Sequence, residues 1–262
     1  MQKHIIFTLG RSGSNYLANL LNAHPQVTNY GEVLGGWTIP YKLYKRFTFG
    51  RIPVDKYLDF IYTSQILFYA AHTYSALAHI KKGEPVNFKN WQQVKTIGIK
   101  DFSLNFKRRE ATSYLKERED ILVINLYREN QFKRFLSLER MKASGLITLQ
   151  KTTGKADSQP LYLDPSKTIR ELEIFDEELK QHQAFVNELQ PYRVLNISYE
   201  ALFHSPESQN YYKEKICDFL DIAPFEISSG HRKISPNKLD QAIENYEEIL
   251  QTVGKTQFAK YL

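Results

Sequence analysis

A short loop near the N-terminus holds the residue types whose spacing points most clearly to chemistry. The run Gly10-Arg11-Ser12-Gly13-Ser14 follows a β-branched and aromatic stretch, His4 to Leu9, and precedes apolar residues at helical spacing between Asn15 and Leu21. This pattern predicts a strand, a loop and a helix. Loop N–H groups and the positive end of the helix dipole then face a common point. The planar fork of Arg11 can hold two oxygens of a phosphate or sulfate, so the loop is typical of an anion site.

The spacing within this loop excludes two common nucleotide-binding loops. The nucleoside triphosphatase loop, G-x-x-x-x-G-K-[ST], needs a lysine on the outer phosphates, and no lysine follows Gly13 at that spacing. The dinucleotide fingerprint G-x-G-x-x-G also fails, because Gly10 and Gly13 stand three apart and no third glycine follows. A tight strand-to-helix turn without a ligand remains the alternative for the loop taken alone.

The composition is that of a globular chain. The chain has 262 residues, of which 42% are apolar and 24% charged, and we expect one domain over residues 1–262. A net charge of +6 suits an anionic small ligand and does not indicate a nucleic acid partner. The one cysteine, Cys217, excludes an internal disulfide and multi-cysteine metal sites.

Three further runs are typical of buried parallel strands. They are separated by helical segments, as an open parallel sheet with helices on both faces requires. Residues 38–93 are aromatic-rich and predict a helical insertion, in which Tyr62, Ile66, Tyr69, Thr73 and Leu77 share one helix face. The three runs are Val94 to Phe102, Ile121 to Tyr127 and Val194 to Tyr199; helices are expected after Asp164, Ser205 and Ser235, and a loop at Lys151 to Ser158.

Two segments bear on location. The first residues, MQKHIIFTLG, are too short an apolar stretch for a signal peptide. The run Ile61 to Ile80 contains too many polar side chains for a spanning helix. We therefore expect a cytoplasmic chain with no membrane partner; the oligomeric state is not readable.

Four motifs in order resemble the sulfotransferases, in their bacterial, cyanobacterial-like branch. FTLGRSGSNYLANLLNAHPQV followed by NYGEVL resembles the family's P-[RK]-[ST]-G-[ST] strand, loop and helix, with Gly10 in place of the proline. Arg128 at a strand end, followed by Ser137 on the next helix, resembles the second family element, with a spacing of nine where eight is common. VLNISYEALFHSPE with KICDFLDI, and HRKISPNKLDQAIENYEEI, resemble the later segments.

The resemblance implies a donor, 3′-phosphoadenosine 5′-phosphosulfate, and a set of residues that bind it. Arg11 would also neutralise charge on the bridging oxygen, and Lys100, at a strand end, would help to stabilise the transferring group, with a solvated lysine as the alternative. Tyr199 would touch the adenine, with core packing as its alternative. No metal is called for. The implied donor-binding residues are Arg11, Ser12, Gly13, Ser14, Asn15 and Tyr16 around the 5′ end, and Arg128, Ser137 and Lys233 at the 3′-phosphate.

The acceptor hydroxyl must lose a proton as it attacks, so a base has to lie within hydrogen-bond reach. Glu32 follows Gly31 in a position that resembles the Gly-Glu of bacterial sulfotransferases, and we expect it to be that base. His72 and His79 are the rival bases, and His24 is expected to cap a helix. Asp101 and Trp91 carry no assignment.

The predicted reaction is the transfer of a sulfuryl group to a hydroxyl of a small molecule, a natural product of secondary metabolism or a glycan. Sulfation on nitrogen stays open. One alternative is a nucleotide or small-molecule kinase on a related sheet. The other is a non-enzymatic anion-binding module that uses the basic run Lys107-Arg108-Arg109, which otherwise forms a solvated helix face.

Overall fold

A five-stranded sheet, with every strand parallel to its neighbours, forms the centre of the computed structural model, which describes residues 1–49, 51–144, 159–224 and 239–262. The strand order is β2-β3-β1-β4-β5, so the first strand lies in the middle. The predicted open parallel sheet is confirmed. The strands are β1 (Gln2–Thr8), β2 (Val27–Asn29), β3 (Thr96–Phe102), β4 (Ile121–Tyr127) and β5 (Val194–Ser198).

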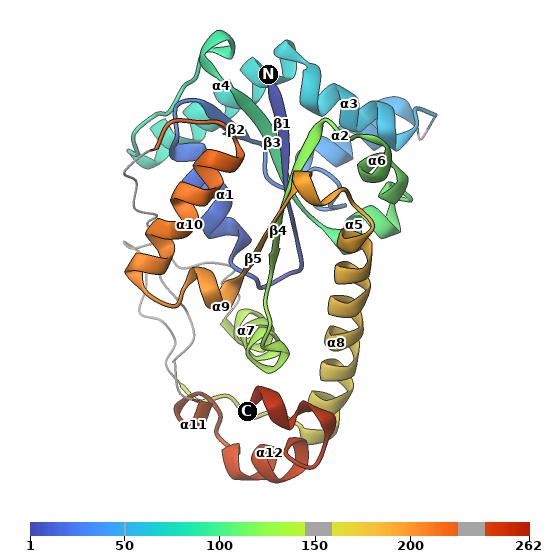
Figure 1. Ribbon diagram of the computed structural model, residues 1–262, viewed down its shortest axis with the longest axis vertical. Helices are drawn as coiled ribbons and strands as arrows, with labels where there is room; N and C mark the ends of the chain where they lie inside the picture. Colours follow the sequence, from blue (N-terminus) through green and yellow to red (C-terminus); the bar gives the residue numbers. More distant parts are fainter. Residues whose placement is uncertain (50, 145–158, 225–238) are drawn as a thin grey trace.

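Helices cover both faces of the sheet and its carboxyl edge (Figure 1). On one face lie α1 (Ser14–Ala23) and α10 (Pro206–Phe219). On the other lie α3 (Val54–Thr63), α5 (Ser103–Arg108), α6 (Thr112–Glu117) and the end of α8 (Pro165–Asn187). Below the carboxyl edge lie α7 (Gln131–Ser144), α11 (Leu239–Ala242), α12 (Tyr246–Val253) and η3 (Gln257–Tyr261). The remaining elements are α2 (Ile39–Thr48), α4 (Gln65–Lys82), α9 (Tyr199–Leu202), η1 (Trp91–Gln93) and η2 (Pro191–Arg193).

The central strand β1 is buried on both faces, which explains its β-branched and aromatic composition. Ile5 and Phe7 pack in one hydrophobic cluster with α3 and α5, while Ile6 packs in a second cluster with α1 and α10. A third cluster joins α7, α8 and the C-terminal elements around Phe132 and Phe175. The sheet and the C-terminal region are thus tied together by α7 and α8.

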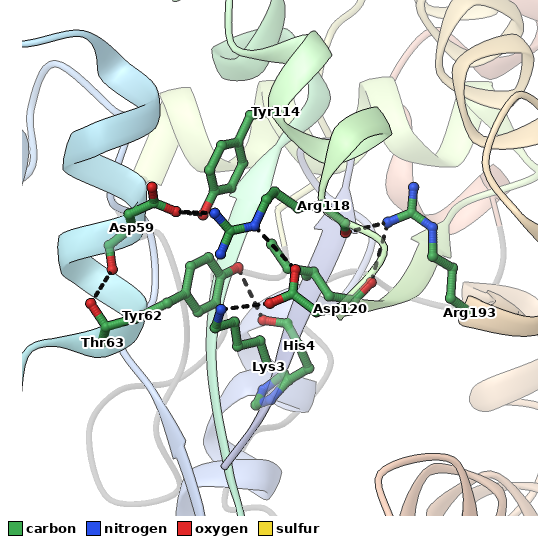
Figure 2. A network of polar contacts seen from close by, with 10 residues as sticks. Lys3, His4, Asp59, Tyr62, Thr63, Tyr114, Arg118, Asp120 and Arg193 are labelled. Atoms are coloured by element: carbon green, nitrogen blue, oxygen red, sulfur yellow. Dashed lines mark hydrogen bonds and ion pairs between the residues drawn. The ribbon is translucent and has the colours of Figure 1, made fainter.

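A polar network closes the amino edge of the sheet, the edge opposite the N-terminal loop (Figure 2). Arg118 pairs with Asp59 at 2.6 Å and with Asp120 at 3.1 Å, and Asp120 also pairs with Lys3 at 2.6 Å. Arg193 is buried and donates to the carbonyl oxygens of Arg118 and Leu115. These contacts join the loops at the amino edge and lie away from the carboxyl edge.

The predicted helical insertion differs from expectation at Ser64. This residue ends α3, adopts an extended ψ of 111°, and accepts a hydrogen bond from the Leu67 N–H at 3.1 Å, so it caps α4. Tyr62 therefore belongs to a different helix from Ile66 and Leu77, which are 82% and 55% exposed. The predicted helices after Asp164 and Ser205 are present with those residues as caps; the loop at 151–158 and the helix start at Ser235 lie outside the described residues.

Candidate active site

The register of the strands brings the ends of β1, β3, β4 and β5 to one edge. Thr8 pairs with Phe102 of β3 and with Leu126 of β4, and Tyr127 pairs with Ser198 of β5. The N-terminal loop, Arg128 and Tyr199 each follow directly on one of these strand ends. This is the edge at which open parallel sheets bind ligands.

Within the N-terminal loop, Gly13 has a backbone conformation that residues other than glycine adopt with difficulty. The φ angle of Gly13 is 81°, and a Cβ there would lie 2.9 Å from Cε2 of Phe203 and 3.0 Å from Cδ2 of Tyr199. Gly13 also provides the N-cap of α1 without a side chain. The N–H groups of the first turn therefore have no cap from Gly13 and no partner within the helix, and they are oriented to bind an anion.

The side chains after the loop differ in what they offer. Ser12 is fully buried, and its Oγ has no hydrogen-bond partner among the described residues. Ser14 is buried, and Asn15 is half-buried. Tyr16 packs on Phe203 and donates to Gln209 Oε1 at 3.2 Å, so its hydroxyl proton is already used within the protein. The orphaned hydroxyl of Ser12 fits a ligand that accepts a hydrogen bond in the loop.

Two predicted phosphate ligands, Arg11 and Ser137, meet in the structure. Arg11 has a φ of 66°, and its Nε donates to Ser137 Oγ at 3.0 Å. A further contact joins Arg11 Nη1 to Met141 Sδ at 3.6 Å. The guanidinium of Arg11 thus lies against α7, on the side where the 3′-phosphate is predicted.

Arg128 lies beside this pair and is buried. Its guanidinium donates to the carbonyl oxygen of Arg11 at 3.4 Å and lies 4.3 Å from the ring centre of Tyr199. The Nε of Arg128 lies 3.7 Å from the carboxylate of Glu200 and makes no hydrogen bond within the described part of the chain. The predicted residues Arg11, Arg128, Ser137 and Tyr199 therefore come together from four different segments.

The electrostatics of this group favour an anion. Burial lowers the pKa of Arg11, and the positive charge of Arg128 lowers that pKa further. Burial also lowers the pKa of Arg128, although Tyr199 and Glu200 act in the opposite direction. Two desolvated guanidinium groups that repel each other would both be stabilised by a bound phosphate.

Two residues that sequence analysis did not assign hold this group in place. Arg134 is buried, donates from Nε to the Gly10 carbonyl oxygen at 2.9 Å, and pairs with Glu178 at 2.6 Å. Glu200 accepts from the N–H groups of Glu129 and Asn130 at 2.9 and 3.2 Å. The Tyr199-Glu200 pair is visible in the sequence, whereas nothing in the sequence marks Arg134.

Glu32 and Lys100 form a second group at the same edge. Lys100 Nζ pairs with Glu32 Oε1, and the other carboxylate oxygen accepts from the indole N–H of Trp37 at 2.9 Å. The Lys100 side chain is 5% exposed and that of Glu32 is 18% exposed. The carboxylate is therefore fixed in direction while one side stays open to solvent.

Asp101 fixes the segment that carries Glu32. It is fully buried, and its Oδ2 accepts from the N–H groups of Val33 and Leu34 at 2.8 and 2.7 Å. Its Oδ1 accepts from Asn105 Nδ2 at 2.6 Å and from the Phe102 N–H at 2.8 Å. Burial raises the pKa of Asp101, and these four hydrogen bonds lower it. The carboxylate of Asp101 thus determines where Glu32 lies.

The histidines considered as bases have other partners. His72 Nε2 lies 3.3 Å from Thr28 Oγ1 on the edge strand β2, and burial lowers the pKa of His72. His79 Nδ1 lies 3.2 Å from Glu84. His24 caps the end of α1 farthest from Gly13, where its Nε2 lies 3.0 Å from the Ala223 carbonyl oxygen. Trp91 packs on Phe68 in the core, and the predicted ligand Lys233 lies outside the described residues.

The described residues leave out 50, 145–158 and 225–238. They hold no group of three or more His, Cys, Asp or Glu side chains arranged to bind a metal ion. They also hold no helix with the length and apolar character needed to cross a membrane. Cys217 is buried.

Comparison with known proteins finds similarity in structure but not in sequence. No protein family model and no curated protein matches the chain. A sulfotransferase from Alicyclobacillus acidocaldarius aligns over 97% of this chain and 93% of its own, with 13% identity and a TM-score of 0.44. The sulfotransferase domain from the curacin biosynthetic pathway aligns over 86% of this chain and 75% of its own, with 17% identity and a TM-score of 0.41. The sulfotransferase domain from the Synechococcus PCC 7002 olefin synthase aligns over 98% of this chain and 92% of its own, with 14% identity and a TM-score of 0.41.

Proposed function

We propose that the chain transfers a sulfuryl group from 3′-phosphoadenosine 5′-phosphosulfate to a hydroxyl of a small molecule. The observation that carries the proposal is the meeting of Arg11, Ser137 and Arg128 at the N-terminal loop, from three different segments. A strand-to-helix turn alone does not require the partly buried Arg11 or the buried Arg128 beside it. The sequence motifs that resemble those of sulfotransferases contain the same residues.

The residues present fit such a donor at both of its ends. The 5′ end would lie over the loop, where the N–H groups of the first turn of α1 and the orphaned Ser12 hydroxyl can donate to it. The 3′-phosphate would lie beside Ser137 and the guanidinium of Arg128, and Arg11, which contacts both residues, would act on the bridging oxygen. Tyr199, whose ring packs on Arg128, would touch the adenine.

Glu32 and Lys100 would act on the acceptor side. The donor supplies an activated sulfuryl group. The acceptor oxygen forms a bond to sulfur while the bond from sulfur to the bridging phosphate oxygen breaks, and that oxygen leaves with the electron pair. Glu32 accepts the proton of the acceptor hydroxyl. Lys100, held by Glu32, stabilises the negative charge that spreads over the sulfuryl oxygens.

The acceptor is proposed to be a natural product or a glycan. The indole of Trp37, which is 57% exposed and bonded to Glu32, supports this class because a sugar or aromatic ring can stack on it beside the base. The cytoplasmic location and a role in secondary metabolism stay predictions from sequence.

Calorimetric titration tests the donor class. We expect 3′-phosphoadenosine 5′-phosphate to bind about 10 to 150 times more tightly than AMP, because the charged hydrogen bonds to the 3′-phosphate contribute about 1.5 to 3 kcal/mol. ATP with magnesium should bind more weakly than 3′-phosphoadenosine 5′-phosphate. Preference for ATP would contradict the proposal and favour the kinase alternative.

The base is tested by turnover in a panel of phenols and monosaccharides, measured as release of 3′-phosphoadenosine 5′-phosphate. Glu32→Gln keeps the shape and loses the basic oxygen, so turnover should fall by about 10² to 10⁴ while nucleotide affinity stays the same. His72→Ala and His79→Ala are the matched controls and should retain turnover. Loss of turnover in one histidine variant, with normal turnover in Glu32→Gln, would move the base to the helical insertion.

A further inference from the structure

Helix α2 and the chain that follows it expose an unusual number of large apolar side chains. Ile39, Leu43 and Phe47 stand at steps of four on α2 and are 53%, 46% and 74% exposed. Phe49 and Ile52, just after the helix, are 83% and 45% exposed. We call these five residues the α2 stripe. Single exposed apolar residues are common, but a continuous row of this kind marks an interaction surface.

Positive charge accompanies the α2 stripe. Lys42, Lys45, Arg46 and Arg51 are all exposed, and residues 33–54 contain no Asp or Glu. At about 100° per residue, the three helical members of the stripe span about 80° of the helix, and the three helical cations occupy the adjoining sector. The outward half of α2 is therefore apolar on one side and cationic on the other.

The inward face of α2 is fixed to the protein, so the stripe does not fold back onto the core. Tyr41 is buried, and the guanidinium of Arg109 lies 4.4 Å from the centre of its ring. The ring of Tyr44 stacks on that of Tyr57 at 4.4 Å. Together α2 and α3 lie at the periphery of the molecule (Figure 1). The α2 stripe thus faces outward at the margin of the fold.

We propose that the α2 stripe docks the protein on an anionic membrane surface. A helix that lies in the membrane interface combines bulky apolar side chains on one face with Lys and Arg on the other. The absence of acidic residues from 33–54 complements the negative surface of anionic lipids. The expectation of no membrane partner was drawn from the lack of a signal peptide and of a spanning helix. A helix that lies on a membrane surface needs neither, so that expectation does not bear on α2. The docking does not depend on the reaction proposed above.

Helix α4 provides a comparison within the same chain. It exposes Ile66, Leu77 and Ile80, at 82%, 55% and 63%, yet its only Lys or Arg residues are Lys81 and Lys82 at its C-terminal end, whereas the cations of α2 lie along the helix beside the stripe. If apolar exposure alone caused adsorption, α4 would adsorb as well as α2. Electrostatic attraction to anionic lipid instead selects α2.

Vesicle co-sedimentation of the whole chain tests the proposal. The probes are vesicles of phosphatidylcholine alone and of phosphatidylcholine with about 30% phosphatidylserine. We expect binding to the anionic vesicles only, and release by about 0.5 M salt, which shortens the Debye length to a few ångströms. Each Lys or Arg near the surface accounts for about a fivefold change in partitioning, so K42Q/K45Q/R46Q should weaken binding roughly 100-fold.

Apolar variants separate the stripe from general charge attraction. L43S/F47S should lose binding to anionic vesicles, whereas the matched pair L77S/I80S on α4 should bind like the unchanged chain. Equal binding to neutral and anionic vesicles, or no loss in L43S/F47S, would overturn the proposal. Sedimentation velocity is run beside it, because a concentration-dependent dimer that L43S/F47S abolishes, without vesicle binding, would assign the stripe to a second copy of the chain.

Discussion

Replacing Asp101 by asparagine should destabilise the protein severely while changing almost no volume. Oδ2 accepts from two backbone N–H groups, and Oδ1 accepts from a third and from Asn105. Whichever oxygen becomes an NH₂ group, two buried donors then face a donor. An unsatisfied buried donor costs about 1 to 3 kcal/mol, so Asp101→Asn should lower the free energy of unfolding by about 2 to 6 kcal/mol.

Urea unfolding and thermal melting measure this loss. Because about 1 kcal/mol lowers Tm by roughly 2 to 4 °C in a protein of this size, Asp101→Asn should melt roughly 5 to 20 °C lower. Asp120→Asn is the matched control, because Asp120 is 50% exposed and pairs with Lys3 and Arg118 at the opposite edge (Figure 2). Its cost should stay below about 1 kcal/mol.

The same variant should impair turnover, since Val33 and Leu34 follow directly on Glu32. Nucleotide affinity should change less, because the loop and Arg128 have no contact with Asp101 among the described hydrogen bonds. An Asp101→Asn protein as stable as Asp120→Asn, with normal turnover, would refute the role given to this carboxylate.

Gly13→Ala places a Cβ 2.9 Å from Phe203 in a left-handed conformation, so it should cost about 1 to 3 kcal/mol in urea unfolding and weaken nucleotide binding in calorimetry; unchanged affinity would contradict the loop's role. His182 of α8 is buried, and its Nε2 lies 2.6 Å from Asn125 Oδ1. Burial lowers the pKa of His182 to about 3, below its unfolded value, so the free energy of unfolding is at its full value above about pH 6.5 and falls with the pH, by about 2 kcal/mol at pH 5. His182→Gln should therefore show a smaller loss of stability between pH 7 and 5, and an unchanged loss would refute this. Arg11→Ala should lower turnover more than nucleotide affinity, because the charge of Arg11 acts on the bridging oxygen as that bond breaks. Equal losses of turnover and affinity would limit Arg11 to nucleotide binding beside Ser137.

Four of the five strands and the N-terminal loop were predictable because their signals are local, whereas the three-residue strand β2 was not predicted as a strand. A β-branched run such as Ile121 to Tyr127 is bounded by turn residues, and the structure places β4 over that same range. Gly13 has a left-handed φ, and a glycine at a strand-to-helix turn is the residue type expected there. Such signals depend on a few neighbouring residues, so they can be read without the fold.

The supporting residues of the site were not predictable, since their partners are distant in sequence. Arg134 pairs with Glu178 and donates to Gly10, 44 and 124 residues away. Two of the four donors to Asp101, the N–H groups of Val33 and Leu34, come from the segment after β2, 68 and 67 residues away. The break at Ser64 was missed because apolar residues continue at helical spacing across it, and that spacing does not show that Ile66 and Leu77 face solvent.

The affinity ratio between 3′-phosphoadenosine 5′-phosphate and AMP, compared between the unchanged chain and Arg128→Ala, tests the central claim most directly. Arg128→Ala should lose about 10 to 150-fold in affinity for the first ligand and almost none for the second, so the ratio should approach one. Arg118→Ala, at the amino edge, is the matched control and should keep the ratio. Equal losses for both ligands, or a ratio that Arg128→Ala leaves unchanged, would contradict a 3′-phosphate site at the N-terminal loop.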